Sequence, residues 1–240
     1  MPNELDDSTA IVTGASSGIG RATAEALSAA GADIVLAARS EDRITALADD
    51  LETDALAVPT DVREEADVEA LVASTVDRFG GVDVLVNNAG LGRGSSVEDL
   101  STDEYRRMME TNVDGMFFTT RAALPHLRES EGTAIFIGSF AGEFPRSFNP
   151  VYAATKWWTR GFAKSLSAQA GDEVAVSIIN PSEVRTEFGS EDGESFEQRF
   201  DEGEVTEPAE IADAVVFAAE QSPSMVSELD LFRRDKFTGL

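Results

Sequence analysis

The chain has 240 residues, 42% of them hydrophobic, and a formal net charge of −26 that results from 45 acidic and 19 basic residues. Proteins bind phosphate groups and anionic membrane surfaces through basic patches, so the negative charge of this chain argues against nucleic-acid and membrane partners. The chain has no cysteine and a single histidine, His126, which excludes disulfides, cysteine nucleophiles and metal sites with several histidine ligands.

No apolar run approaches the ~20 residues that a membrane-spanning helix needs. The first ten residues, MPNELDDSTA, are polar and acidic, unlike a secretory signal. No linker or repeat divides the sequence, and its length suits one hydrophobic core. We therefore expect a soluble, cytoplasmic protein with a single domain over residues 1–240.

Seven short apolar segments predict β-strands. They are nearly continuous in Val, Ile and Leu, which is typical of strands buried on both faces of a parallel sheet. The expected strands are residues 9–14, 33–38, 55–60, 82–90, 133–139, 174–181 and 227–232.

Helical patterns fill the intervals between these strands. The expected helices are residues 18–30, 41–52, 64–79, 102–129, 151–170 and 207–221. This alternation predicts an α/β fold: a Rossmann-type, doubly wound parallel sheet of about seven strands with helices on both faces. Ligands of such sheets bind at the carboxyl ends of the strands.

Residues 183–206 form the longest predicted connection. The segment is polar and contains several glycines, yet it carries Phe188, Phe196 and Phe200. Long connections of this kind are often lids. We expect residues 183–206 to form a substrate-binding lid that covers an apolar group.

A glycine-rich turn, TGASSGIG at residues 13–20, directly follows the first predicted strand and opens the first helix. Gly14 permits a tight turn, while Gly18 and Gly20 let the backbone approach a pyrophosphate at the helix N-terminus. The turn therefore predicts a dinucleotide site.

Tyr152 and Lys156 stand four residues apart in a predicted helix and so share one face of it. Only three of the 19 basic residues of the chain are lysines. A lysine at this position in such a chain indicates a specific use of its ammonium group.

Together these motifs resemble the short-chain dehydrogenase/reductase family, over about residues 10–216. The resemblance is carried, in order, by Thr13–Gly20, Asp61-Val62 and the NNAG sequence at Asn87–Gly90. It continues with Asn112, with Ser139, and with the Tyr-x-x-x-Lys pattern of Tyr152 and Lys156.

The resemblance implies Asn112, Ser139, Tyr152 and Lys156 as catalytic residues. Tyr152 would exchange a proton with the substrate oxygen, and Lys156 would lower the pKa of its phenol and hold the nicotinamide ribose. Ser139 would stabilise the developing charge, and Asn112 would hold a water in a proton relay. By the same resemblance, the cofactor-binding residues are Gly14, Ser16, Ser17, Gly18, Ile19, Gly20, Arg39, Ser40, Asp61, Val62, Asn88, Ala89, Gly90, Tyr152, Lys156, Pro181 and Thr186. No metal is expected.

The end of the second strand favours NADP(H) as the cofactor. An acidic residue there would bind the ribose hydroxyls of NAD, but the chain has Ala38, followed by Arg39 and Ser40, which suit a 2′-phosphate. Glu41 and Asp42 follow closely and leave NAD(H) as the alternative.

The substrate is expected to be a small apolar carbonyl compound or alcohol, because Phe140, Phe144, Phe148 and Phe188 are candidates for the walls of its pocket. The resulting prediction is an NADP(H)-dependent oxidoreductase that interconverts ketone or aldehyde carbonyls and secondary alcohols. The alternatives are a 3-oxoacyl-thioester reductase and a catalytically inactive dinucleotide-binding regulator. A homodimer or homotetramer is expected.

The surface composition resembles that of proteins from halophilic archaea that accumulate salt. Carboxylates stay hydrated in concentrated salt, whereas in dilute salt the same charges repel one another. We therefore expect a halophilic protein; a merely acidic protein with a bias toward arginine is the alternative.

Overall fold

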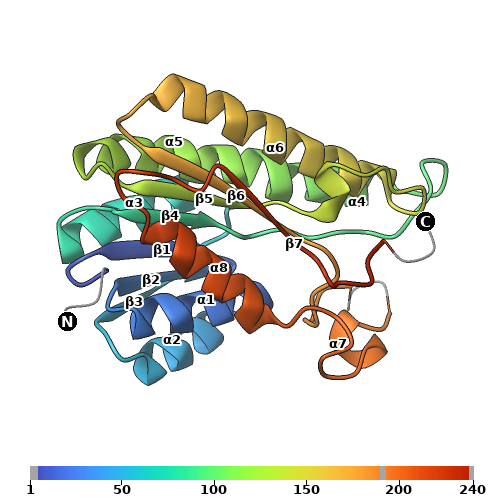
Figure 1. Cartoon of the computed structure of the whole chain (residues 1–240), viewed down its shortest axis with the longest axis horizontal. Helices are drawn as coiled ribbons and strands as arrows, with labels where there is room; N and C mark the ends of the chain where they lie inside the picture. Colours follow the sequence, from blue (N-terminus) through green and yellow to red (C-terminus); the bar gives the residue numbers. More distant parts are fainter. Residues whose placement is uncertain (1–4, 190–192, 238–240) are drawn as a thin grey trace.

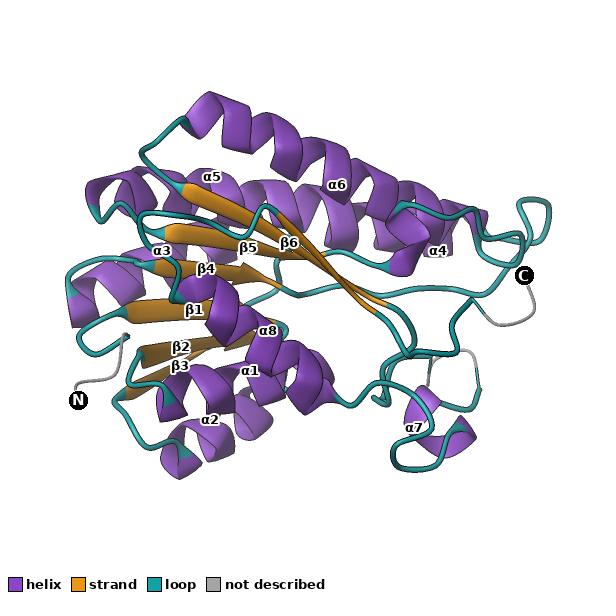
Figure 2. Cartoon of the chain, in the orientation of Figure 1, coloured by secondary structure: helices purple, strands orange, loops and turns teal. Residues whose placement is uncertain are grey.

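The seven apolar segments form one parallel β-sheet in the computed structural model, which describes residues 5–189 and 193–237 (Figures 1 and 2). Its strands are β1 (Thr9–Thr13), β2 (Asp33–Ala38), β3 (Ala55–Pro59), β4 (Val84–Asn87), β5 (Thr133–Ile137), β6 (Ala175–Pro181) and β7 (Glu228–Leu231). Their order is β3-β2-β1-β4-β5-β6-β7, and every neighbouring pair is parallel. The direction of winding reverses between β1 and β4, where a doubly wound sheet opens a crevice for ligands.

Helices cover both faces of the sheet. They are α1 (Gly18–Ala29), α2 (Glu41–Asp50), α3 (Glu65–Phe79), α4 (Thr102–Met109), α5 (Gly115–Glu129), α6 (Pro150–Ala170), α7 (Phe196–Arg199) and α8 (Pro208–Ala219), with a π-helical turn η1 (Glu110–Asp114) and a 3₁₀ turn η2 (Phe140–Gly142). One hydrophobic core joins the sheet to α1, α2 and α8, and a second core joins it to α3, α5 and α6. The sheet is therefore the middle of three layers, as Figure 2 shows.

None of the helices in the described part of the chain is long and apolar enough to cross a membrane.

Local signals explain several helix boundaries. Helix α3 ends at Gly80, which takes a left-handed φ of 92° that favours glycine. Helix α4 begins with a capping box in which the side chains of Ser101 and Glu104 each bind the other's backbone N–H. Helices α6 and α8 begin with Pro150 and Pro208, at a position where a missing N–H costs nothing.

The predicted fold class is confirmed, with differences in detail. The strand expected over residues 82–90 ends at Asn87, because the following residues leave the sheet to form a cavity wall. The single helix expected over residues 102–129 is divided by the π-helical turn η1. Helix α7, within residues 183–206, was not expected, since its four residues are too few to give a helical pattern.

Candidate active site

A cavity of about 360 Å³ opens at the carboxyl ends of the strands. It is lined by Gly14, Ser16, Ser17, Gly18, Ile19, Arg39, Ser40, Asp61, Val62, Asn88, Ala89, Gly90, Ser139, Tyr152, Lys156, Pro181 and Thr186. The structure thus brings together every candidate residue predicted from the sequence except Gly20 and Asn112, which lie behind the wall.

The glycine positions of the turn after β1 do not accommodate a side chain. Gly14 and Gly18 have φ values of 68° and 53°, in the left-handed region. A Cβ added at Gly20 would stand 2.3 Å from the carbonyl oxygen of Gly14. The turn brings backbone N–H groups to the N-terminus of α1, an arrangement that fits a pyrophosphate.

Side chains from β1 and β4 fix this turn against the next strand end. The Thr13 hydroxyl accepts the N–H groups of Asn88 and Ala89, each at 3.0 Å, and donates to the Val86 carbonyl. In return, the Asn88 amide donates to the Thr13 carbonyl at 2.8 Å. Residues of both motifs therefore form one rigid wall at the point where the winding reverses.

The far end of the cavity, beyond β2 and β3, is positively charged. Arg39 and Ser40 are exposed there, and the Ser40 hydroxyl makes no capping bond to α2. Asp61 is bound by Arg63, whose Nε donates to Oδ1 at 2.9 Å. This hydrogen bond, with a further one from the Arg63 backbone, holds the pKa of Asp61 below its usual range despite partial burial.

Arg107 lies close enough to three other arginines to be affected by their charges. The pKa of Arg107 is lowered, first by burial and then by the charges of Arg39, Arg93 and Arg63. In a chain with 45 acidic residues, this gathering of arginines marks the part of the cavity that suits an anionic group.

Asn112 lies in the π-helical turn between α4 and α5. Its side-chain oxygen accepts from Leu91 N at 2.9 Å, while its amide donates to the Leu91 carbonyl and to Thr155 Oγ1. These bonds tie the loop after β4 to α6, the helix of Tyr152 and Lys156. The water relay assigned to Asn112 stays a prediction.

Tyr152, Ser139 and Lys156 converge at the carboxyl end of β5. The Ser139 side chain interacts with the Tyr152 hydroxyl and lowers its pKa, and Ser139 Oγ accepts from Ala141 N at 3.1 Å. Lys156 is 6% exposed, and its Nζ donates to the Ile137 carbonyl at 2.8 Å. Burial lowers the pKa of Lys156 to about 8.

The lowering of the Tyr152 pKa by Lys156 stays a prediction. In the structure, burial raises the pKa of Tyr152, and the opposing contributions come from Ser139 and the charge of Arg146. The Lys156 ammonium is directed at the end of β5 and lies 5.9 Å from the centre of the Tyr152 ring.

The wall of the cavity beside Tyr152 is apolar. Phe188 and Phe196 line the cavity with Leu91 and Gly92, and the Phe188 ring centre lies 5.7 Å from that of Tyr152. Both phenylalanines belong to the predicted lid, residues 183–206, of which residues 190–192 lie outside the described part of the chain.

Three of the four phenylalanines expected in the substrate pocket are absent from the described lining of the cavity. Phe140 and Phe144 stack at 4.3 Å and pack with Phe232 and Phe237 near the C-terminus, and Phe148 is 59% exposed. The sequence could not show this, because the two partner phenylalanines lie some ninety residues further along the chain.

Several lining residues had not been anticipated: Ala37, Ala38, Thr60, Arg63, Leu91, Gly92, Thr111, Ile137, Gly138, Ser182, Val184, Glu187 and Gly189. Most of them lie at or directly after the ends of the predicted strands, so their place at the carboxyl ends of the sheet was the available signal. Arg63 carries the clearest chemistry, because it lines the cavity with Arg39 and forms an ion pair with Asp61.

These features fit a nicotinamide dinucleotide. The glycine turn would hold the pyrophosphate, Asp61 and Val62 the adenine side, and Asn88, Ala89 and Lys156 the ribose beside Tyr152. The absence of room for a Cβ at Gly20 lets the start of α1 pack closely against the turn, as this motif requires.

Comparison with known proteins agrees with this geometry. A family model described as short chain dehydrogenase matches residues 8–197. An uncharacterized oxidoreductase of Staphylococcus epidermidis is 36% identical over 226 residues, which are 93% of this chain and 95% of that protein.

Two solved structures are similar in fold and sequence. An alcohol dehydrogenase from Thermococcus sibiricus, complexed with 5-hydroxy-NADP, has a TM-score of 0.86 and 31% identity and covers 94% of this chain and 96% of its own. A 3-ketoacyl-(acyl-carrier-protein) reductase from Brucella melitensis, complexed with NADH, has a TM-score of 0.85 and 30% identity, with coverages of 95% and 97%.

Proposed function

The chain belongs to the short-chain dehydrogenase family, and from this premise we propose that it is an NADP(H)-dependent oxidoreductase that interconverts carbonyl compounds and secondary alcohols. The observation that carries the proposal is that Ser139, Tyr152 and buried Lys156 line the same cavity as the glycine turn.

The chain's own residues supply the proton and stabilise the charge. A bound nicotinamide supplies hydride to the carbonyl carbon in reduction and accepts it in oxidation. Tyr152 gives its phenolic proton to the carbonyl oxygen in reduction, and the raised pKa of its buried hydroxyl keeps that proton available at neutral pH. Ser139 donates a hydrogen bond to the same oxygen as negative charge develops there.

The charge of the adenosine end favours NADP(H). Ala38 stands where an acidic residue would bind the ribose hydroxyls of NAD, Arg39 and Ser40 follow it, and Arg63 and Arg107 lie close to Arg39. Guanidinium groups bind phosphate through paired, charge-assisted hydrogen bonds. The related structures hold both kinds of cofactor, so the preference depends on these side chains.

The substrate side of the cavity supports a small, apolar carbonyl compound or alcohol. Phe188, Phe196 and Leu91 present hydrocarbon beside Tyr152. The second candidate, reduction of a 3-oxoacyl thioester, is supported by the similarity to the Brucella reductase. It requires a surface for an acidic acyl carrier, and a net charge of −26 disfavours such docking.

Two further properties belong to the proposal. The excess of acidic residues and the near absence of lysine support a protein adapted to high salt. The exposed aromatic rings of Phe117 on α5 and Trp157 on α6 support self-association as a homodimer or homotetramer.

The test is a panel of ketones and alcohols assayed with NADPH and NADH, or their oxidised forms, in molar KCl. The expected result is turnover of small apolar ketones with a preference for NADPH. Turnover of acyl thioesters alone would support the second candidate, and the absence of any turnover with cofactor binding retained would contradict both.

A further inference from the structure

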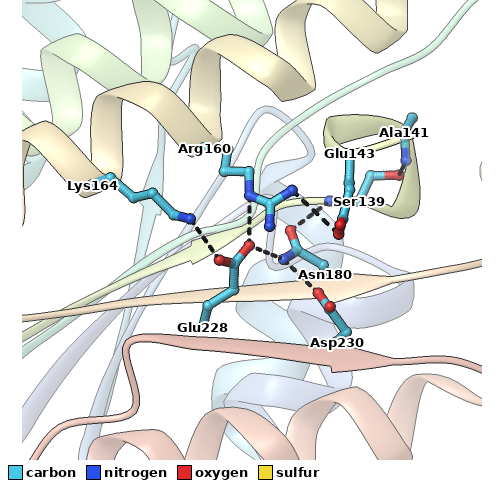
Figure 3. Close-up of polar contacts among 8 residues, drawn as sticks. All are labelled: Ser139, Ala141, Glu143, Arg160, Lys164, Asn180, Glu228 and Asp230. Carbon is cyan, nitrogen blue, oxygen red and sulfur yellow. Dashed lines mark hydrogen bonds and ion pairs between the residues drawn. The ribbon is translucent and has the colours of Figure 1, made fainter. Parts of the chain in front are cut away.

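Asn180 is buried at the end of β6, directly behind the catalytic serine. Its side chain is 4% exposed, and its oxygen accepts the backbone N–H of Ser139 at 3.3 Å. Its amide nitrogen donates to Glu228 Oε1 and Asp230 Oδ1 on β7, each at 2.9 Å (Figure 3). The side chain therefore connects the outermost strand to the residue that begins η2.

The two carboxylates determine which way the Asn180 amide faces. An ionised carboxylate only accepts hydrogen bonds, so the NH₂ group must point toward Glu228 and Asp230. The oxygen is then directed at Ser139. The opposite orientation would place an amide oxygen against two carboxylates and leave the Ser139 N–H facing a donor.

Glu228 is itself held by cations from α6. Arg160 Nε lies 2.7 Å and Lys164 Nζ 2.9 Å from its carboxylate, as Figure 3 shows. Although burial alone would raise it, the hydrogen bonds of Lys164 and Arg160 keep the pKa of Glu228 below its usual range. Arg160 also pairs with Glu143, just after η2, at 3.2 Å.

These contacts join α6, which carries Tyr152, to the segment after β5, which carries Ser139. Tyr152, Lys156, Arg160 and Lys164 recur every four residues along α6, so the helix that carries the acid also anchors Glu228. The path continues from Glu228 through Asn180 to Ser139.

The backbone at Ser139 has little freedom beside Asn180. A Cβ at Gly138 would lie 2.0 Å from the Asn180 side-chain oxygen, so the strand end approaches this amide as closely as glycine allows. The N–H of Ser139 is bound by Asn180 and its Oγ accepts from Ala141 N, so both groups of Ser139 are held beside Tyr152, whose pKa the Ser139 side chain lowers.

We propose that Asn180, oriented by Glu228 and Asp230, is a positioning residue that holds Ser139 in hydrogen-bond contact with Tyr152. The inference rests on the proposed function, in which Ser139 and Tyr152 act on the carbonyl oxygen. Asn180 touches neither substrate nor cofactor in this role; its effect passes through the Ser139 hydroxyl.

The test uses the fact that the chain has only two tyrosines, Tyr105 and Tyr152. In a Tyr105→Phe background, ultraviolet absorbance of the phenolate reports the titration of Tyr152 alone, without turnover. The Ser139 hydrogen bond lowers the pKa of Tyr152, so Ser139→Ala should raise it. Asn180→Ala should raise it by about half a pH unit or more.

The double variant separates positioning from a general effect on the fold. If Asn180 acts through Ser139, Asn180→Ala should add nothing to the shift of Ser139→Ala. An unchanged Tyr152 titration in Asn180→Ala would overturn the inference, as would an equal shift in both backgrounds. Circular dichroism at each pH verifies that the fold persists.

Kinetics give the second readout. For Asn180→Ala we expect kcat to fall about tenfold while the KM for NADPH changes less than about twofold. If Asn180→Ala fails to fold, Glu228→Ala removes one anchor of the amide and should shift the titration in the same direction by less. A matched control, Glu173→Gln, breaks an exposed ion pair with Arg128 and should change neither readout.

The two proposals fail separately. An inactive wild-type enzyme would contradict the proposed function, while the Tyr152 titrations would still decide the role of Asn180. An active wild type whose Tyr152 titration and kcat are insensitive to Asn180→Ala would remove the positioning role and leave the function intact.

Discussion

Strands β1 to β4 and strands β5 to β7 contribute to the same cavity, but they shape it by different means. On the β1–β4 side, the wall is backbone: glycines in left-handed conformations, and strand ends joined by Thr13 and Asn88. On the β5–β7 side, the wall consists of buried side chains held by hydrogen bonds and ion pairs. All three lysines of the chain lie on this second side.

The two sides of the cavity differ in the substitutions that each one tolerates. A backbone wall fails through crowding, so an added methyl group is enough to damage it. A wall of buried polar side chains fails when one partner is removed, because the remaining group loses its hydrogen bond without regaining water.

The largest effect among the binding variants is expected for Gly20→Ala. Its Cβ would lie 2.3 Å from the Gly14 carbonyl oxygen, and overpacking of this kind costs about 1–3 kcal/mol. NADPH affinity should fall about 10–100-fold, measured by the fluorescence of the bound nucleotide. Gly161→Ala is the matched control, since its Cβ would meet nothing within 4 Å in α6. Unchanged affinity in Gly20→Ala would mean that this turn does not hold the cofactor.

Arg39→Asp tests the charged end of the β1–β4 side. Loss of a charge-assisted hydrogen bond, worth about 1.5–3 kcal/mol, should shift the NADPH-to-NADH preference about 10–100-fold toward NADH. The ratio of kcat/KM for the two cofactors measures this shift. Arg21→Asp makes the same charge change at a residue paired with Glu25, outside the main cavity. A preference that moves equally in both variants would indicate a general charge effect.

Lys156 provides a direct test of burial on the β5–β7 side. With only three lysines, selective labelling gives few NMR signals, and one of them should titrate near pH 8 and vanish in Lys156→Arg. Because this pKa lies below the ordinary value of 10.5, burial of the ammonium reduces stability below pH 8. That loss should disappear as the pH rises from about 8 to about 10.5. A Lys156 signal that titrates at the ordinary value would contradict the buried geometry.

The smallest effect should come from salt, which acts on the surface of both sides alike. Screening of a net charge of −26 should raise the melting temperature by about 5 °C or more between 0.1 M and 3 M KCl. Sucrose at equal osmolality is the control for a general stabilising solute. A melting temperature that does not increase with KCl beyond this control would end the proposal of adaptation to salt.

The same contrast explains what the sequence could predict. The glycine turn, the NNAG segment and the Tyr152–Lys156 pair depend on residues close together in the chain, so local patterns could indicate residues that the structure brings to one cavity. The fold followed from the alternation of apolar runs and helical patterns. Both kinds of signal are short-range.

The β5–β7 side depends on contacts between distant residues, which no local pattern contains. Asn180 meets Glu228 and Asp230 about fifty residues later, and Phe140 packs with Phe232 and Phe237 rather than with a substrate. The burial that raises the pKa of Tyr152 has the same origin, since burial is a property of the whole fold.

In the proposed function, the β1–β4 side of the cavity binds most of the cofactor and the β5–β7 side provides the proton. Turnover and NADPH affinity measured on the same preparation of Tyr152→Phe test it most directly. We predict that turnover falls by about 10²–10⁴-fold, while the dissociation constant of NADPH stays within about threefold of the wild-type value. Turnover within tenfold of the wild type, or a loss of NADPH binding equal to the loss of turnover, would contradict the account.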